Sequence, residues 1–379
     1  MLTPLQDALR AQLAGQPVRE TDYRGATTAT SFSDAHDEFS ALLNGCGIYD
    51  LGFRARISLT GSDRVRWLNG MVTNNIRDLA AGRGVYAFLL NPQGRILGDM
   101  FVYNQSEALT VETDRSQVEK IVATFDHYII MDDVEVTNVS EQQTALGLAG
   151  PKSRAILNAA GIEVPELQPL QMITPECNCD CGCLRCTVVR GEDAPQESYE
   201  IWLALKDAYN TWRALLAAGA RPVGSEALEM QRIANGIPLY GVDIRERDLP
   251  QETEQMRALN FNKGCYVGQE IVERIRSRGN VHRKFAGFLM EGAPAIPAGS
   301  KIISGKAGEE EKEVGEITSV AVLRTPSGER TLALGYIRRE VGVPGREVTI
   351  GGVKATVIKL PFESTAPGQA EEALLHQSL

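Results

Sequence analysis

The residues best equipped for chemistry in this sequence lie together in the octapeptide from Lys263 to Glu270. Cys265 follows Gly264, whose missing side chain permits a positive φ just before the thiol. The residues from Val267 onward predict the opening of a helix, so the thiol lies just ahead of a helix N-terminus and close to Lys263. Such surroundings favour the thiolate, the form of cysteine that attacks electrophiles or binds metal. We therefore predict that Cys265 is a functional residue assisted by Lys263; the alternative is a small apolar cysteine packed in a tight turn.

The segment that follows this octapeptide is basic, although the whole chain carries a net charge of −10. Its basic residues are Lys263, Arg274, Arg276, Arg278, Arg283 and Lys284, against the acidic Glu270 and Glu273. This local excess could attract an anionic ligand, an RNA backbone or an acidic partner, and it could equally be a solvated helix face. Direct RNA binding is therefore an open hypothesis. The acidity of the whole chain argues against a general nucleic-acid coat protein.

The composition of the 379-residue chain is that of a globular protein with two or three domains. Hydrophobic residues make up 43% and charged residues 23%, both close to the averages for soluble domains. No apolar run approaches the roughly 18 residues needed to cross a bilayer. Polar residues interrupt the N-terminal stretch, so no signal peptide is expected. We predict a cytoplasmic protein with no membrane partner.

Five of the seven cysteines crowd between Cys177 and Cys186. In a cytosolic chain such residues are thiols or metal ligands rather than a disulfide framework. Cys183 and Cys186 have the spacing of half a metal site, but no second pair and no nearby histidine completes a familiar pattern. Unligated thiols are the preferred interpretation, with a zinc or cluster site as the alternative. We assign no metal ligands.

Helical and strand patterns alternate up to about residue 284, and short strands with Gly and Pro punctuation follow. We expect an α+β body over 1–284, a C-terminal β-barrel over 285–364 and a mobile tail over 365–379. Within the body, Asp34, Asp63 and Asp114 are predicted to cap helices, since each precedes a helical pattern. The predicted strands that bear on the site are 55–59, 85–90, 96–103 and 199–205.

Several motifs of this chain resemble one known family. Lys263-Gly264-Cys265-Tyr266-Val267-Gly268-Gln269-Glu270 is similar to the signature of the YgfZ-type folate-binding proteins, which include bacterial tRNA-modification helpers and a mitochondrial iron–sulfur assembly factor. These proteins share a fold with the glycine cleavage system T-protein, an aminomethyltransferase. The resemblance runs from about Cys46 to Phe362. It implies a body of two interwoven α/β lobes, a C-terminal β-barrel, and tetrahydrofolate as the cofactor.

The resemblance also implies roles for single residues. Glu200 matches the family's pterin-binding glutamate, whose carboxylate can accept two hydrogen bonds from the pterin edge. Asp99 matches the catalytic carboxylate, which would also contact the folate. Arg232 and Tyr240 match the arginine and tyrosine that line the folate pocket. The alternatives are an outward-facing strand carboxylate for Glu200, a strand-end residue for Asp99 and a structural ion pair for Arg232.

This sequence departs from the T-proteins at several site positions. Gly52-Phe53 stands where T-proteins have Ser-His, Gly98-Asp99 retains the second of two aspartates, and the region of Thr113 lacks a pterin-binding asparagine. Residues 194–198 replace a Tyr-Thr-Gly-Glu motif, and T-proteins lack the thiol. The departures favour folate binding without aminomethyl transfer.

The resemblance and the residues lead to one expected function and two alternatives. We expect a tetrahydrofolate-binding accessory protein for iron–sulfur cluster assembly or repair that supports cluster-dependent enzymes such as tRNA methylthiolation enzymes. Its partners would be iron–sulfur assembly or client proteins, and Cys265 would act as thiolate ligand or nucleophile. The alternatives are a folate-dependent aminomethyltransferase of the T-protein type and an RNA-associated binding module.

Overall fold

The computed structural model describes residues 1–12, 19–175, 185–192, 197–279, 281–305, 311–325 and 328–362. These residues form two compact units. Unit 1 comprises Met1–Leu228, Glu246–Pro250 and Gln255–Ser277. Unit 2 comprises Glu229–Arg245, Gln251–Glu254 and the chain from Arg278 onward. Unit 2 therefore takes in two segments that precede the barrel strands in the sequence.

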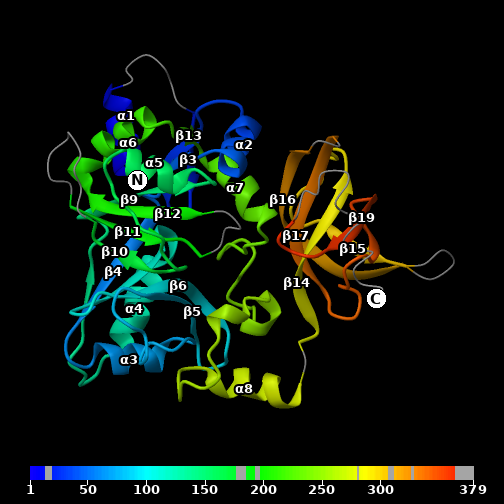
Figure 1. Cartoon of the computed structure of the whole chain (residues 1–379). Coiled ribbons are helices and arrows are strands. Elements are labelled where there is room, and N and C mark those ends of the chain that lie inside the picture. The colour runs from blue at the N-terminus through cyan, green and yellow to red at the C-terminus, as the bar shows by residue number, and fades with distance from the viewer. Residues whose placement is uncertain are drawn as a thin grey trace, which may run out of the picture. The chain divides into compact units, whose positions relative to one another are not determined.

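Unit 1 contains two sheets with helices on their outer faces (Figure 1). The first sheet has the strand order β10 (Met172–Ile173), β11 (Cys186–Arg190), β12 (Ser198–Ala204), β9 (Gln143–Ala149), β3 (Gly47–Asp50) and β13 (Arg221–Val223). Its outer face packs against α1 (Pro4–Gln12), α5 (Ser153–Ala159) and α6 (Ala208–Ala217). Leu5, Leu157 and Trp212 from these helices join strand residues such as Ile48 and Ile201 in one hydrophobic core.

The second sheet of unit 1 carries the strands that bear Asp99 and its neighbours. Its order is β5 (Gly84–Leu90), β6 (Ile96–Asn104), β7 (Leu109–Asp114), β4 (Arg54–Thr60) and β8 (Glu135–Asn138). The predicted strands 55–59, 85–90 and 96–103 are thus confirmed. Helices α3 (Arg64–Met71) and α4 (Val118–Tyr128) cover one face through residues such as Leu68 and Phe125.

The alternation of residue types along β4 explains which face of this sheet the helices cover. Ala55, Ile57 and Leu59 belong to the hydrophobic core that includes α3 and α4. Successive residues of a strand point to opposite faces, so Arg54 and Arg56 lie on the other face, away from these helices. That charged face meets the first sheet through a cluster of aromatic side chains, described below.

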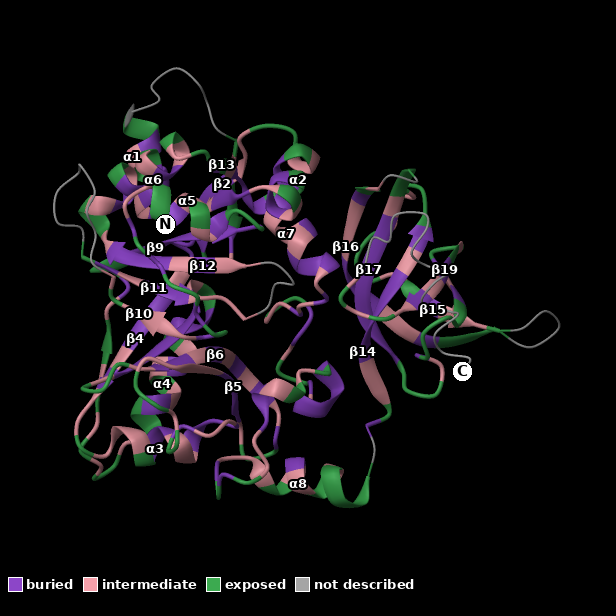
Figure 2. Ribbon diagram, viewed as in Figure 1, coloured by how far each residue is buried: buried purple, intermediate pink, exposed green. Residues whose placement is uncertain are grey.

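The remaining elements of unit 1 are shorter or lie at its edges. They are the hairpin β1 (Arg19–Tyr23) and β2 (Ala26–Ser31), the helices α2 (Ala35–Asn44) and α8 (Gln269–Arg278), the first part of α7 (Ser225–Ala234), and the 3-10 turns Arg115–Gln117, Leu205–Asp207 and Met256–Ala258. The helix predicted to open after Val267 is therefore present as α8. Figure 2 shows that α8 is largely solvent-exposed, with Val272 as its buried residue.

All three predicted caps lie at N-cap positions, but only one of them caps with its side chain. The carboxylate of Asp34 accepts from the backbone N–H groups of His36 and Asp37, as an N-cap should. Asp63 precedes α3 but makes no capping hydrogen bond, because its carboxylate accepts from the backbone N–H of Asp133 instead. Asp114 makes none either, because its carboxylate is bound to the guanidinium of Arg54.

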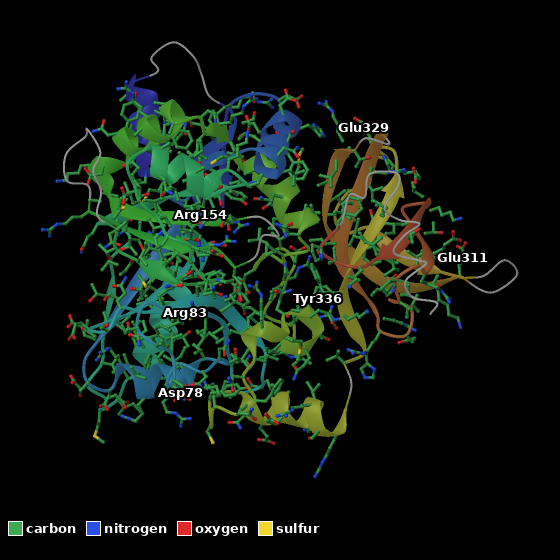
Figure 3. The ribbon with its side chains drawn as sticks, viewed as in Figure 1. Asp78, Arg83, Arg154, Glu311, Glu329 and Tyr336 are labelled. Carbon is green, nitrogen blue, oxygen red and sulfur yellow. The ribbon has the colours of Figure 1, made fainter. Side chains whose placement is uncertain are left out.

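Unit 2 contains the predicted barrel. Its strands close in the order β14 (Arg283–Glu291), β17 (Gly328–Arg338), β16 (Lys312–Thr325), β15 (Lys301–Ser304), β18 (Glu347–Ile350) and β19 (Val353–Ile358). Phe288, Ile317 and Ile337 are buried in its core. Tyr336, labelled in Figure 3, packs edge-on against Phe285 with ring centroids 5.5 Å apart. The 3-10 turn Pro250–Thr253 lies at the boundary of the two units.

Some predictions fall on segments outside the described residues. Cys177, Cys179, Cys181 and Cys183 are among them, as is the tail over 365–379. Among the described residues, no helix is long and apolar enough to span a membrane.

Candidate functional site

An aromatic cluster lies between the two sheets of unit 1. Its buried members are Tyr23, Leu51, Phe53, Tyr103, Leu170, Val189 and Trp202, with Ala26 and Ala145; the half-buried Tyr49, Phe101 and Met172 pack against them. Tyr49 and Phe101 keep some accessible surface although they pack against this cluster. Flat aromatic walls of this kind suit a planar heterocycle.

Glu200 and Tyr49 flank a glycine on neighbouring strands of the first sheet. Gly147 on β9 is paired with Glu200 on β12 and with Tyr49 on β3. A Cβ on Gly147 would lie 2.0 Å from Cε2 of Tyr49, so the tyrosine ring packs directly on the glycine backbone. Glycine at this position is therefore required for the ring to lie where it does.

Glu200 is half-buried and only partly satisfied by hydrogen bonds. Its Oε2 accepts from Nε1 of Trp202 at 2.9 Å, and its Oε1 accepts no hydrogen bond from a described residue. Burial, and next the charge of Glu112, raises the pKa of Glu200 to about 7. Such a carboxyl group has one oxygen available to a ligand that brings its own N–H donors.

Two arginines of β4 pair with the carboxylates of β7, and one of these carboxylates, Glu112, acts on Glu200. Arg54 donates to Asp114 at 2.6 Å, and Arg56 donates to Glu112 at 2.8 Å. The Arg56 guanidinium also lies 4.3 Å from the centre of the Trp202 ring. The Nε atoms of both arginines are buried and have no hydrogen-bond partner in the described part of the chain. These arginines fix the charged face of the second sheet and leave polar groups unsatisfied beside Glu200.

Asp99 is held from both sides by neutral donors. Its Oδ2 accepts from the Tyr86 hydroxyl at 2.7 Å, and its Oδ1 accepts from the Gln117 side-chain amide at 2.8 Å. Its backbone is fixed as well, because the carbonyl accepts from the Thr113 hydroxyl at 2.8 Å. Burial, and next the charge of Asp114, raises the pKa of Asp99. The carboxyl group is therefore rigidly placed and half-buried.

Cys265 is exposed, at the corner that leads into α8. The preceding Gly264 has a φ of +95°, as the sequence suggested for this turn. Gly268 has a φ of +82°, and a Cβ there would lie 2.5 Å from the Asn91 carbonyl. The corner thus packs by backbone contact against the turn between β5 and β6, the hairpin that carries Tyr86 and Asp99.

Lys263 is buried and its ammonium group faces away from solvent. It donates to the backbone carbonyls of Asn69, Val72 and Asn74, the last at 2.6 Å. Burial, and next the charge of Arg77, lowers the pKa of Lys263 to about 7. Within the described residues, no interaction joins the ammonium to Cys265. Lys263 is therefore placed to hold the loop rather than to contact the thiol.

A short series of contacts joins this loop to Asp99. The Asn74 side-chain amide donates to the Tyr86 carbonyl at 2.8 Å and to the Arg257 carbonyl at 2.9 Å. The Arg257 guanidinium lies 4.5 Å from the centre of the Tyr86 ring, and the hydroxyl of that ring reaches Asp99. The thiol corner and the Asp99 carboxyl group are thus parts of one packed framework within unit 1.

The other two predicted residues, Arg232 and Tyr240, belong to unit 2. Arg232 is buried; it donates to Asp243 at 2.7 Å and to Ser319 at 2.9 Å, and pairs with Glu229 at 2.8 Å. These contacts are those of the structural ion pair that was the sequence-based alternative. Tyr240 is half-buried. Their part in folate binding stays a prediction.

Sequence reasoning missed most of the groups that surround Glu200 and Asp99. These are Tyr49, Arg54, Arg56, Tyr86, Glu112, Gln117 and Trp202. One signal was available, since charged residues two positions apart on a predicted strand must share a face, as Arg54 and Arg56 do. Partners on different strands, such as Tyr86 and Asp99, carry no such local signal. Among the described residues, no cluster of three His, Cys, Asp or Glu side chains is arranged to hold a metal ion.

Comparison with known proteins identifies the family. A family model described as the GCVT N-terminal domain matches residues 14–263, and one described as the glycine cleavage T-protein C-terminal barrel domain matches residues 283–363. The chain belongs to the glycine cleavage T-protein family. Aminomethyltransferases are among its relatives: that of Halothermothrix orenii is 27% identical over 91% of this chain and 96% of its own length, and that of Bacillus subtilis is 26% identical over 95% and 98%. A chloroplastic protein of Arabidopsis thaliana, named as a transferase, is 27% identical over 88% and 74%.

The T-protein fold is also shown by a solved structure. The glycine cleavage system aminomethyltransferase T from Bartonella henselae matches with a TM-score of 0.82 over 96% of this chain and 98% of that one, at 21% sequence identity. The expected fold, with two α/β lobes and a six-stranded C-terminal barrel, is confirmed. The narrower resemblance to the YgfZ-type branch rests on the octapeptide around Cys265.

Proposed function

We propose that this T-protein family member binds tetrahydrofolate in unit 1 and uses Cys265 to support iron–sulfur cluster assembly or repair. The observation that carries the thiol's part is the exposure of Cys265 on a glycine corner packed against the hairpin of Asp99. A thiol that must meet a partner protein or a cluster has to be accessible. Partners would be assembly factors or cluster-dependent enzymes such as tRNA methylthiolation enzymes, as the YgfZ-type resemblance implies.

The residues around the aromatic cluster fit a pterin. Glu200 offers a carboxyl oxygen without a hydrogen bond from the described residues, and a pterin presents adjacent N–H donors to such a group. The half-buried Tyr49 and Phe101 supply aromatic faces beside it. Glu200 would hold the pterin and Asp99 would lie toward the folate, which when bound supplies a carrier for one-carbon groups. Arg232 and Tyr240 stay predicted folate-pocket residues on the YgfZ-type resemblance alone, and the anionic glutamate tail of tetrahydrofolate would suit the basic segment that follows Cys265.

Aminomethyl transfer is the second candidate, because the matched aminomethyltransferases align along nearly their whole length with this chain. Asp99 is retained, and burial raises its pKa, which is the direction that favours proton exchange by a carboxyl group. The names of the relatives favour this candidate, whereas the exposed thiol and the altered Gly52-Phe53 and Gly98 positions favour the accessory role.

One set of variants separates the two candidates. A strain defective in cluster-dependent tRNA modification is complemented with the wild type, Cys265→Ala, Cys265→Ser and Glu200→Gln, and the purified proteins are assayed for aminomethyl transfer to tetrahydrofolate. The accessory role predicts loss of rescue in both cysteine variants and no aminomethyl turnover. Equal rescue by wild type and both cysteine variants would remove the thiol from the function. Aminomethyl turnover that persists in Cys265→Ala would establish the second candidate.

Folate binding is tested separately by titration. Glu200→Gln keeps the size of the side chain but replaces an acceptor oxygen with an amide donor, so tetrahydrofolate should bind at least about tenfold more weakly, the effect of losing a charge-assisted hydrogen bond. Tyr240→Phe tests the part of the Tyr240 hydroxyl. Unchanged affinity in Glu200→Gln would contradict the proposed pterin contact.

The basic helix α8 bears on the third hypothesis, RNA binding. Arg274 and Arg276 are exposed, but Arg276 pairs with Glu273 at 3.6 Å and lies 4.3 Å from the centre of the Phe261 ring. RNA binding through this helix stays a prediction, and its measure is salt-dependent affinity that weakens in Arg274→Ala.

A further inference from the structure

Lys263 occupies a cage of backbone carbonyls at the end of a helix. Asn69 lies in the last turn of α3, Val72 is the residue that ends it, and Asn74 follows in the next turn. Carbonyls at a helix C-terminus lack intrahelical partners and lie at the negative end of the helix dipole. All three carbonyls accept from the one ammonium group. A residue distant in the sequence thus supplies the cation that the end of α3 requires.

The stoichiometry of the cage matches an ammonium group. Three N–H bonds are directed to three carbonyl oxygens, so every donor of the charged form is used. The cation also lies 5.1 Å from the centre of the Tyr266 ring, which is buried beside it. With all of its donors directed inward, this ammonium has none left for a thiolate at Cys265. The arrangement therefore favours a structural anchor over a general acid or base that acts on Cys265.

The tip of the thiol corner, Gly264 and Cys265, is exposed to solvent. A Cβ on Gly264 would meet nothing within 4 Å. Cys265 is therefore bracketed between the buried side chains of Lys263 and Tyr266. The backbone N–H of Val267 donates to the Gly70 carbonyl at 3.1 Å, which ties the same corner to α3 a second time.

From these contacts we infer that Lys263 is a positioning residue: its ammonium group, bound by the carbonyls of Asn69, Val72 and Asn74, fixes the corner that presents Cys265. Asn74 connects this anchor to the other half of the site, because its side chain donates to the Tyr86 carbonyl. The anchor therefore holds the thiol on the framework that carries Asp99. The functional role of this anchor rests on the proposed function of Cys265. The anchoring contacts themselves can be tested without that function.

The test compares Lys263→Met with Lys263→Arg, and with Arg274→Met as a control that removes an exposed charge nearby. Backbone hydrogen exchange is followed by mass spectrometry at about pH 6, below the pKa of about 7 of Lys263, in the peptide that contains the Val267 amide. Loss of the ammonium should speed exchange of this amide at least about fivefold. A fivefold change corresponds to a loss of about 1 kcal/mol in the free energy of local opening. Lys263→Arg should stay closer to the wild type, and Arg274→Met should match it.

Two results would contradict the anchoring role of Lys263. One is exchange in Lys263→Met within about twofold of the wild type in a protein with an unchanged melting temperature. The other is exchange in Arg274→Met as fast as in Lys263→Met, because loss of an exposed neighbouring charge would then have the same effect as loss of the buried ammonium group.

A measurement on the wild type covers the case in which Lys263→Met does not fold. Reductive methylation should modify the exposed Lys206 well before the buried Lys263, and equal rates would contradict the cage. Failure of the proposed function has a different signature, because a Cys265→Ser variant that rescues cells fully would remove the thiol's role and leave both measurements on Lys263 unchanged.

Discussion

The Tyr86 hydroxyl donates a 2.7 Å hydrogen bond to Oδ2 of Asp99, across the paired strands β5 and β6. Burial raises the pKa of Asp99, and this hydrogen bond acts in the opposite direction because it favours the carboxylate. The bond therefore offsets part of the effect of burial on the residue that matches the family's catalytic carboxylate. It also joins Asp99 to the framework of the thiol corner through the backbone of Tyr86.

Removing the Tyr86 hydroxyl should change both the free energy of unfolding and the pKa of Asp99. Tyr86→Phe should lower the free energy of unfolding of unit 1 by about 1 kcal/mol, the usual effect of losing a buried hydrogen bond to a partner that stays behind. It should also raise the pKa of Asp99 further. Urea unfolding followed by tryptophan fluorescence reports on unit 1, because Trp67, Trp202 and Trp212 all lie there. Tyr128→Phe is the control; a Tyr86→Phe protein as stable as that control would contradict the role of the bond.

Glu200 should make the stability of unit 1 depend on pH. Its pKa in the folded protein is raised from 4.5 to about 7, so the folded state binds more protons than the unfolded state in that interval. The contribution is fully present below about pH 4.5 and is lost as the pH rises through 7, with a slope that approaches about 1.4 kcal/mol per pH unit. Glu200→Gln should lack this component. Subtracting the two stability curves cancels the other carboxylates, and a flat difference between pH 4.5 and 7 would refute the expectation.

The sequence predicts the fold well because the fold depends on patterns that repeat along the chain. Alternating residue types define β4 and β6, a short apolar run defines β5, and closely spaced short strands define the barrel. Helix caps were less predictable, because an aspartate before a helix is also free to bind something else. Asp114 shows this, since its carboxylate is bound to Arg54, sixty positions away. The partner lies on a different strand, and local sequence carries no information about it.

The site was predictable only where a residue's own neighbours in the sequence suggested its role. The exposure of Cys265 and the positive φ of Gly264 follow from the octapeptide itself. The inward direction of Lys263 does not, because its carbonyl partners belong to the end of α3. Backbone carbonyls are present in every residue, so no residue type marks them as a cation cage. Tyr49 was missed for a similar reason, as its neighbour Gly147 lies on another strand.

The position of the Tyr49 ring should depend on Gly147. Gly147→Ala would place a Cβ 2.0 Å from the Tyr49 ring, so the ring must move away from the strand that it packs on. We expect tetrahydrofolate affinity to fall at least about tenfold, with a loss of stability of about 1–3 kcal/mol from overpacking. Gly70→Ala is the matched control, since a Cβ at that helical position meets nothing within 4 Å. Alanine there should be neutral or stabilising by up to about 1 kcal/mol. Equal folate binding by both alanine variants would disprove the role of Gly147.

Replacing one member of the buried Arg56–Glu112 pair should destabilise the protein much more than replacing both members. Both side chains are buried, with a 2.8 Å contact between them. Arg56→Met leaves the Glu112 carboxylate without its nearest cation and should destabilise unit 1 by about 3–5 kcal/mol, whereas the double change Arg56→Met with Glu112→Leu should recover most of that loss. The exposed Arg10–Glu20 pair provides the comparison, where Arg10→Met should cost under about 1 kcal/mol. Tryptophan-monitored urea unfolding of the three variants measures all of these differences. A double variant no more stable than Arg56→Met would mean that the guanidinium is needed for its packing on Trp202 rather than for charge balance.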